Sequence, residues 1–185
     1  MTLGLSLSVF LAGTVLVMAV SWRSLRAPGS HGFFRFFAFE AILGILVLNA
    51  PVWFRRAFTP TQLASWVLLL ASLGLVVHGA RLLVRSGHPA RPGSDSPLCR
   101  IENTTVLVTS GAYRFIRHPL YASLLCLAWG AAVKSLSTAS VALAVVASGA
   151  LLAAAKAEEA ENVSRFGEAY LAYMASTRRF IPFVW

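Results

Sequence analysis

The sequence predicts an all-α integral membrane protein with five transmembrane helices, the last two forming a helical hairpin, and a cytoplasmic C-terminal amphipathic helix. The 185 residues are 57% hydrophobic and only 12% charged, with a mean hydropathy of +0.71, whereas a soluble domain has about twice that share of charged residues. The apolar residues form long runs rather than alternating or one-sided patterns. A soluble helical protein has no way to cover five such runs, so we expect one membrane domain over residues 1–185.

Three spans are predicted within residues 1–85. The first is Leu3–Val20, and because no positive segment precedes it and no small-residue cleavage site follows it, we interpret it as a span rather than a signal peptide. The second, Phe36–Trp53, contains Glu40, whose carboxylate we expect to face other helices, a polar pocket or the membrane interface. The third is the leucine-rich run Leu63–Leu83.

Residues 86–118 are predicted to form a cytoplasmic loop. Its first half is rich in Pro and Gly, and loops of this length without periodic structure are usually functional or disordered, so we interpret this half as a mobile connector. Residues 104–108 are mostly β-branched, and we expect them to be extended. They lead into a polar and aromatic segment that ends directly before the next apolar run.

Residues 119–155 are predicted to be the helical hairpin. Pro119–Val133 begins with proline in its first turn, which is a favoured position, and it is short for a full span. A tight turn follows, and Ala139–Ala155 is the fifth span, rich in Ala and Val. From Lys156 to Thr177 the pattern becomes amphipathic, which predicts a cytoplasmic interfacial helix and tail over residues 156–185.

We interpret the net charge of +9 and the pI of about 10.8 as a sign of how the chain is oriented in the membrane, not of nucleic-acid binding. All but three of the 16 Lys and Arg residues fall on one side of the predicted spans, the exceptions being Arg55, Arg56 and Lys134. Because basic residues mark the cytoplasmic side, we expect the N-terminus outside and the C-terminus in the cytoplasm. No nucleic-acid motif is present. Cys99 and Cys126 have no metal-ligand spacing, so no metal site or disulfide is expected.

Two dense polar segments, residues 111–121 and 158–173, are therefore predicted to lie together on the cytoplasmic side. Arg117 offers a rigid fork to a carboxylate or phosphate, and Glu158 and Glu159 accept from an ammonium group or from hydroxyls. The tyrosines of both segments add flat apolar rings, each with a hydroxyl group that can form hydrogen bonds. Together they suit a zwitterionic ligand with an aromatic end. The alternative is a set of ordinary juxtamembrane arginines and a solvated helix face.

The spacing of these residues resembles the isoprenylcysteine carboxyl methyltransferase family and the related phospholipid methyltransferases, over about residues 107–182. The resemblance rests on a joint pattern of three parts. They are Gly111-x-Tyr113-x-x-x-Arg117-His118-Pro119-x-Tyr121, then Glu158-Glu159, then Phe166-Gly167-x-x-Tyr170-x-x-Tyr173 with a closing Arg179-Phe180-Ile181-Pro182.

The resemblance implies that S-adenosylmethionine is held between the loop before the fourth span and the start of the C-terminal helix. It assigns catalytic positions to Arg117, Glu158 and Glu159. The residues implied to line the cofactor site are Thr105, Val106, Leu107, Val108, Tyr113, His118, Pro119, Leu120, Tyr121 and Glu158. It also implies a lipid or lipid-modified acceptor that enters from the bilayer.

The chain departs from the family pattern at two positions. Ala154 stands where carboxyl methyltransferases of this type have an arginine assigned to the substrate, and Asn162 stands where a leucine is usual. Isoprenylcysteine-like carboxyl methylation and phospholipid amine methylation therefore both stay open as the reaction. For an amine acceptor, Glu158 or Glu159 is the expected proton acceptor. A sterol-reductase-like enzyme with a nicotinamide cofactor and a non-enzymatic membrane scaffold are further alternatives.

Overall fold

The structure, a computed structural model, describes residues 2–55, 58–87 and 105–182, and the regular structure in these residues is helical apart from one isolated β-bridge between Ile116 and Arg178. The all-α class is thus confirmed for this part of the chain. The helices in order are α1 (Leu3–Leu25), α2 (His31–Asn49), η1 (Ala50–Val52), α3 (Pro60–Ser86), η2 (Gly111–Arg114), α4 (Pro119–Val133), α5 (Thr138–Phe166) and α6 (Glu168–Ser176).

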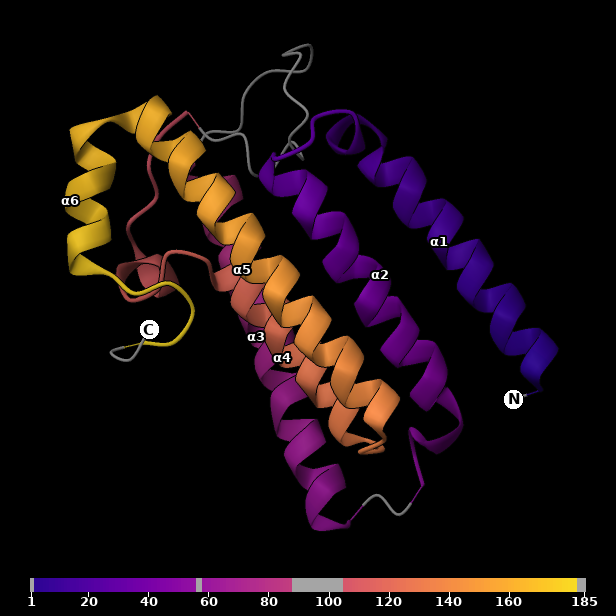
Figure 1. The fold of residues 1–185 in the computed structure, drawn as a ribbon. Coiled ribbons are helices and arrows are strands. Elements are labelled where there is room, and N and C mark those ends of the chain that lie inside the picture. The colour runs from indigo at the N-terminus through magenta and orange to yellow at the C-terminus, as the bar shows by residue number, and fades with distance from the viewer. Residues whose placement is uncertain (1, 56–57, 88–104, 183–185) are drawn as a thin grey trace.

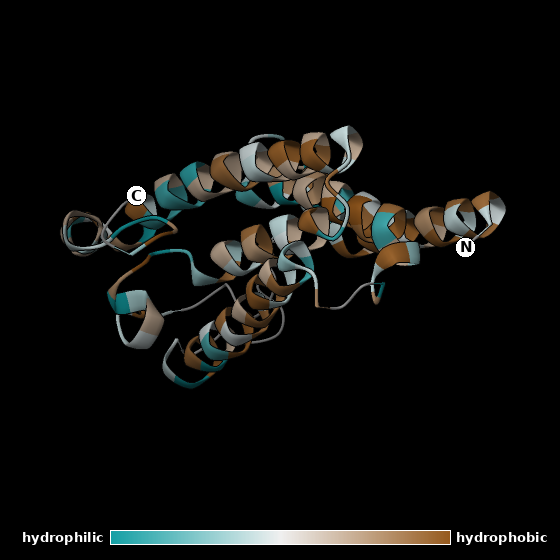
Figure 2. Ribbon diagram, turned by 90° about the horizontal axis from the view of Figure 1, so that it is seen from below, coloured by the Kyte–Doolittle hydropathy of each residue, from teal (hydrophilic) through white to brown (hydrophobic). Residues whose placement is uncertain are grey.

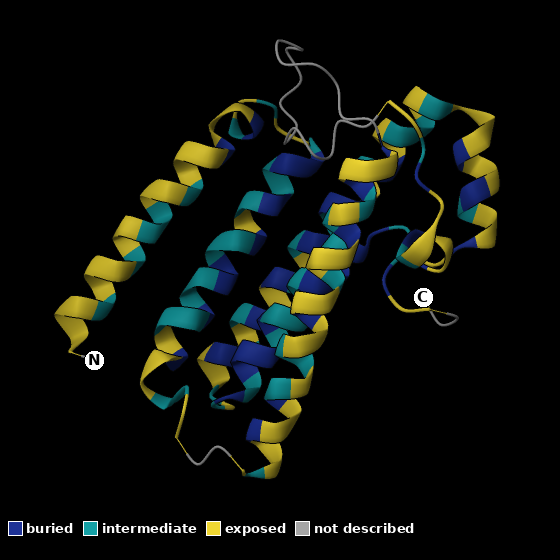
Figure 3. Cartoon of the chain, turned by 180° about the vertical axis from the view of Figure 1, so that it is seen from behind, coloured by how far each residue is buried: buried dark blue, intermediate teal, exposed yellow. Residues whose placement is uncertain are grey.

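The long helices form an elongated bundle with α6 at one end (Figure 1). In it, α1 packs on α2 and α2 packs along α5. The antiparallel pair α4 and α5 is the predicted hairpin, and α4 also packs along α3. After α5 the chain folds back into α6, beside the C-terminal end of α5. Seen from behind, α1 is the most exposed helix of the bundle (Figure 3).

Within the described residues, four helices are long and apolar enough to cross a membrane, namely α1, α2 together with η1, α3 and α5. Figure 2 shows hydrophobic residues along the lengths of the helices and hydrophilic ones toward the C-terminal end of α5. The fifth predicted span is α4, which has 15 residues. At about 1.5 Å per residue it is roughly 22 Å long, shorter than a span of about 20 residues requires. The prediction of a multi-pass membrane protein is supported, with four candidate spans.

The first connection is shorter than the sequence suggested. We predicted spans ending at Val20 and starting at Phe36, but α1 continues to Leu25 and α2 begins at His31. The reason is local, because the Ser30 hydroxyl accepts from the backbone amide of Phe33 and so caps the new helix at an earlier point. This shift places His31 in the first turn of α2.

The predicted break between the fifth span and an amphipathic helix at 155/156 is wrong. Instead, α5 runs without interruption from Thr138 to Phe166 and ends at Gly167, whose φ of +59° suits glycine. No Gly or Pro interrupts Lys156–Phe166, so nothing stops the helix there. Its 29 residues give a length of roughly 44 Å, which exceeds the hydrocarbon core of about 30 Å. The charged end of α5 therefore extends beyond the apolar part of the bundle.

Small residues hold α2, α4 and α5 close together. Ala38, Ala128, Ala144 and Ala154 are all 0% exposed, as expected where helix backbones approach closely in membrane proteins. Several buried polar groups are paired across helices. For example, the Asn49 side-chain amide donates to the Ala131 carbonyl at 2.8 Å. This rigid packing fixes the phase of α5 and so decides which of its residues face the site.

Most of the predicted connector 86–110, including Cys99, lies outside the described residues. Residues 105–110 are described and contain neither helix nor strand. The Thr105 amide donates to the Gly87 carbonyl at 3.0 Å, so this segment starts at the end of α3. Cys126 is a free cysteine in α4.

Candidate functional site

The segment before α4 is shaped by the end of α3. Gly111 has φ +58°, and a Cβ there would lie 2.6 Å from Leu82 Cδ1 and 2.8 Å from His78 Nε2, so no larger residue fits. The amide of Ala112 donates to His78 Nε2 at 3.3 Å. Through this contact His78 helps to position the short helix η2.

Arg117 connects this segment to the end of α6. Its Nε donates to Glu159 Oε1 at 2.8 Å, and its Nη1 donates to the carbonyls of Met174 and Thr177 at 3.1 and 2.7 Å. These carbonyls belong to the last turn of α6, where backbone acceptors lack helical partners. The guanidinium therefore binds a carboxylate of α5 and the end of α6 at once. Its side chain is 9% exposed.

Glu159 is the centre of a buried ion cluster. It accepts from Arg117, and it also accepts from Arg179 through Nε at 3.1 Å and Nη2 at 2.7 Å. His118 Nε2 lies 3.4 Å from the same carboxylate. With 7% of its side chain exposed, Glu159 is engaged by three side chains. A carboxylate bound in this way orders its surroundings, and a buried cluster of this kind is strongly destabilised when one member is lost.

The backbone reinforces the same junction. The amides of Arg117 and His118 donate to the carbonyls of Arg178 and Arg179 at 2.7 and 3.1 Å, and the amide of Arg178 donates to the carbonyl of Phe115 at 3.0 Å. The tail after α6 thus runs beside the segment before α4. The Ile116–Arg178 bridge described above belongs to this pairing.

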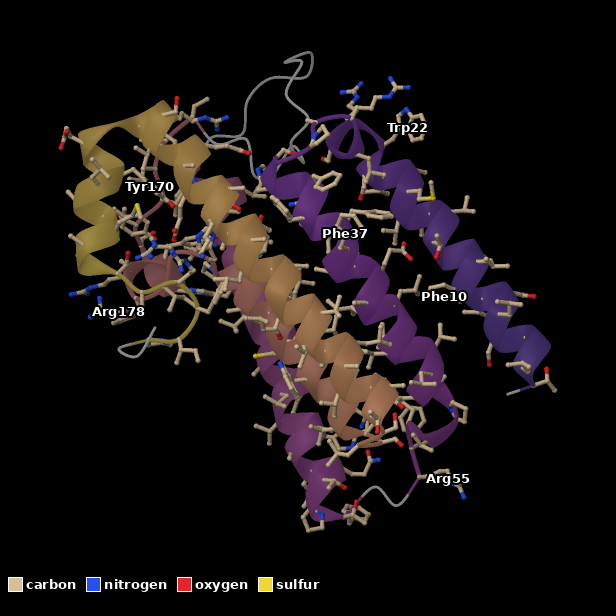
Figure 4. The ribbon with its side chains drawn as sticks, viewed as in Figure 1. Phe10, Trp22, Phe37, Arg55, Tyr170 and Arg178 are labelled. Atoms are coloured by element: carbon tan, nitrogen blue, oxygen red, sulfur yellow. The ribbon has the colours of Figure 1, made fainter. Side chains whose placement is uncertain are left out.

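Aromatic rings line the inner side of the junction. The His118 ring stacks on Tyr121 with centroids 5.4 Å apart and an interplanar angle of 11°. From α6, the Tyr173 hydroxyl donates to the carbonyl of Tyr113 at 2.6 Å, and Tyr170 lies on the side of α6 that faces α5 (Figure 4). Burial raises the pKa of the Tyr170 phenol to about 12. Tyr170 is therefore a neutral hydrogen-bonding group at physiological pH.

These elements enclose a pocket at the charged end of α5. Its cavity volume is about 80 Å³, and the whole empty space between its walls, including the part open to the surroundings, is about 770 Å³. Four residues of α5 at helical spacing, Glu158, Glu161, Asn162 and Arg165, form one wall. The other lining residues are His31, Leu83, Val108, Tyr113, Arg117, His118, Leu120, Tyr121, Phe166, Tyr170 and Tyr173.

The pocket brings together part of the predicted site. Val108, Tyr113, Arg117, His118, Leu120, Tyr121 and Glu158 line it, whereas Thr105, Val106, Leu107, Pro119 and Glu159 are not among its lining residues. Pro119 is buried in the first turn of α4. The two neighbouring glutamates thus differ in environment, because Glu158 faces the pocket with 26% of its side chain exposed and Glu159 faces the ion cluster.

The sequence did not indicate that His31 and Glu161 belong to the pocket. The backbone amide of His31 donates to Glu161 Oε1 at 3.2 Å, and His31 Nδ1 lies 2.7 Å from Glu161 Oε2. The pair joins the first residue of α2 to the end of α5 across 130 positions of sequence. The available signals were the i, i+3, i+4, i+7 spacing of the α5 wall and the capping serine before His31.

Comparison with known proteins agrees with the resemblance drawn from the motifs. Residues 98–169 match the model of the phospholipid methyltransferase family. The matched region includes the segment before α4, the hairpin and the acidic end of α5. No curated protein and no solved structure matches the chain.

Proposed function

We propose that this chain, whose residues 98–169 match the phospholipid methyltransferase family, transfers a methyl group from S-adenosylmethionine to the amine of a phospholipid headgroup. One observation carries the proposal: within the matched region, the Arg117-His118-Pro119-x-Tyr121 segment and the acidic wall of α5 form one pocket at the end of an apolar helix bundle. By the bias of basic residues, this end of the bundle faces the cytoplasm.

The residues of the pocket fit this methyl donor. A sulfonium and an α-ammonium are both cations, and the pocket offers them a carboxylate on Glu158 and aromatic faces on Tyr121 and Tyr170. Asn162 adds both a donor and an acceptor for hydroxyl groups. Bound there, the donor would supply an activated methyl group and a neutral thioether as leaving group.

The protein's own contribution is to align the reactants and exclude water. The buried cluster of Arg117, Glu159 and Arg179 fixes the segment before α4 against α5 and the tail. It therefore holds Glu158 and His118 at a constant separation, with 3.9 Å between Glu158 Oε1 and His118 Nδ1. Holding two reactants near attack distance in a water-poor site can supply several kcal/mol of the barrier reduction.

The choice of acceptor follows from position 154. Ala154 is 0% exposed and lies in the hydrophobic cluster with Ala38 and Leu151. This position therefore provides no cation for an acceptor carboxylate. An isoprenylcysteine carboxylate, the acceptor that the sequence motifs suggested first, would need such a partner, whereas an amine needs a carboxylate to take its proton. The pocket wall of α5 has two carboxylates, Glu158 and Glu161, from which such a group can come.

Transfer of labelled methyl to defined lipids tests the proposal. The purified full-length protein is incubated with labelled S-adenosylmethionine and mixed micelles containing phosphatidylethanolamine or a farnesylcysteine analogue. We expect label on the phosphatidylethanolamine, and we expect Glu158→Gln to abolish it while Glu168→Gln, an exposed change on α6, does not. Label on farnesylcysteine alone would favour carboxyl methylation. Binding of a reduced nicotinamide dinucleotide without methyl transfer would favour the reductase alternative, and binding of neither cofactor would favour a scaffold.

A further inference from the structure

The α5 wall of the pocket has two acidic positions, each next to a different neighbouring element. Glu158 lies beside His118, at the α4 side, and Glu161 lies beside His31, at the α2 side. They are three positions apart on α5, which is slightly less than one helical turn, so both reach into the same space. A methyl transfer joins two ligands, a donor and an acceptor, and each brings a cationic nitrogen when the acceptor is an amine.

His31 holds the Glu161 carboxylate in one orientation. The backbone amide binds one carboxylate oxygen and the imidazole binds the other, at 3.2 and 2.7 Å. A carboxylate has about four acceptor positions on its two oxygens, and these two contacts occupy one on each. The Glu161 side chain is 42% exposed, whereas that of His31 is 3% exposed. The carboxylate is thus anchored on its α2 side and is accessible to a ligand on its pocket side.

The surface of α2 that follows His31 is suited to the apolar part of a lipid. Phe33, Phe34, Phe36 and Phe37 come directly after it and make edge-to-face ring contacts with one another. Phe37 is 44% exposed, and Figure 4 shows it on α2, the helix next to α1. An amphiphile with its headgroup at Glu161 would place its apolar part along these rings.

We propose that Glu161, oriented by His31, binds the ammonium group of the acceptor headgroup, while Glu158 serves the methyl donor. This inference rests on the proposed function and assigns the two acidic positions to different ligands. Before transfer, the ammonium N–H bond breaks and its proton moves to a Glu161 oxygen. The freed nitrogen lone pair then forms the new C–N bond as the C–S bond of the sulfonium donor breaks, and that electron pair stays on sulfur.

The recognition chemistry predicts a preference among headgroups. Phosphatidylethanolamine presents N–H donors to Glu161, phosphatidylcholine presents a quaternary nitrogen without N–H, and phosphatidylglycerol presents no cation. We therefore expect the first to bind most tightly. Arg165, one turn after Glu161 in the same wall, places a positive charge near the side where the headgroup phosphate would lie.

Calorimetric titration of the full-length protein in detergent tests the assignment without requiring turnover. The probes are short-chain phosphatidylethanolamine and S-adenosylhomocysteine, each titrated separately. We expect Glu161→Gln to weaken phosphatidylethanolamine binding about tenfold or more, since one charge-assisted hydrogen bond is lost, and to leave S-adenosylhomocysteine binding unchanged. Glu158→Gln should show the reverse pattern, and Glu168→Gln should change neither.

Further variants separate the proposed role from loss of folding. Glu161→Asp keeps the charge and should retain more phosphatidylethanolamine binding than Glu161→Gln. His31→Asn, which keeps a side-chain donor near the Nδ1 position, should retain binding, whereas His31→Phe should weaken it. Unchanged phosphatidylethanolamine binding in Glu161→Gln, or an equal loss of both ligands in that variant, would overturn the inference. Absence of methyl transfer in the wild-type protein, by contrast, would count against the proposed function and not against this lipid site.

Discussion

Substitution of Glu159 by glutamine separates an anchoring role from a chemical one. The carboxylate accepts from Arg117 and from two nitrogens of Arg179, at distances of 2.7–3.1 Å, and is 7% exposed. Glutamine keeps one acceptor oxygen but turns an amide N–H₂ toward a guanidinium. Removing one partner of a buried ion pair costs about 3–5 kcal/mol. Because Arg179 is itself 20% exposed, we expect the lower end, about 3 kcal/mol.

This loss is large enough to measure by thermal unfolding. For a chain of this size, each kcal/mol shifts the unfolding temperature by about 2–4 °C, so the Glu159→Gln protein should unfold roughly 6–12 °C lower than wild type. Glu158→Gln is the matched control on the adjacent residue. Its partly exposed carboxylate lies 3.9 Å from His118, and we expect its removal to cost less than about 1 kcal/mol. An unchanged unfolding temperature in Glu159→Gln, together with complete loss of methyl transfer, would refute the anchoring argument.

Further predictions concern the shape and protonation of the junction. Gly111→Ala should lower stability by about 1–3 kcal/mol and weaken S-adenosylhomocysteine binding, whereas Gly149→Ala, with nothing within 4 Å of the added methyl, should do neither in the same titration. Tyr173→Phe removes the hydroxyl that donates at 2.6 Å to the loop before α4, so we expect the free energy of unfolding to fall by about 1 kcal/mol in a thermal unfolding experiment. An unchanged unfolding temperature would show that other contacts hold that loop in place. Ala154→Arg puts an unpaired charge in the core, so we expect aggregated protein on size exclusion, and a stable, active variant would contradict the assigned packing. Since burial raises the pKa of Tyr170 to about 12, the phenol stays neutral to a higher pH than a free tyrosine, and Tyr170→Phe should leave the pH dependence of donor binding unaltered between about pH 6 and pH 9.

The apolar runs predicted the bundle well, because whether a helix can lie in lipid depends mainly on its length and its share of apolar residues. Long uninterrupted runs identify α1, α2, α3 and α5 without any tertiary information. The error at Lys156 arose because a change from apolar to charged residues marks where a helix leaves the lipid, not where it ends. Backbone continuity depends on Gly and Pro, and the next of these after Lys156 is Gly167.

The sequence predicted that two segments meet to form the site. It did not predict which residues of these segments face the pocket and which face the ion cluster. Glu158 and Glu159 are equivalent in sequence, yet one step around a helix turns one to the pocket and the other to the arginines. Which is which depends on the phase that α2 and α4 impose on α5. His31 could not be assigned to the pocket, because its partner Glu161 lies 130 positions away and the capping serine before His31 indicates only where α2 begins.

The pairing of residues 178–180 with the segment before α4 has a consequence for biosynthesis. Arg117 and the Thr177 carbonyl that it binds are 60 positions apart, and a ribosome adds residues one at a time from the N-terminal end. During translation, the bundle helices can insert into the membrane while this stretch is still unmade. A nascent chain that ends before this stretch contains every side chain proposed above to be catalytic. It still lacks the tail that holds these side chains in alignment. These contacts can therefore form only after residues 177–179 have left the ribosomal tunnel.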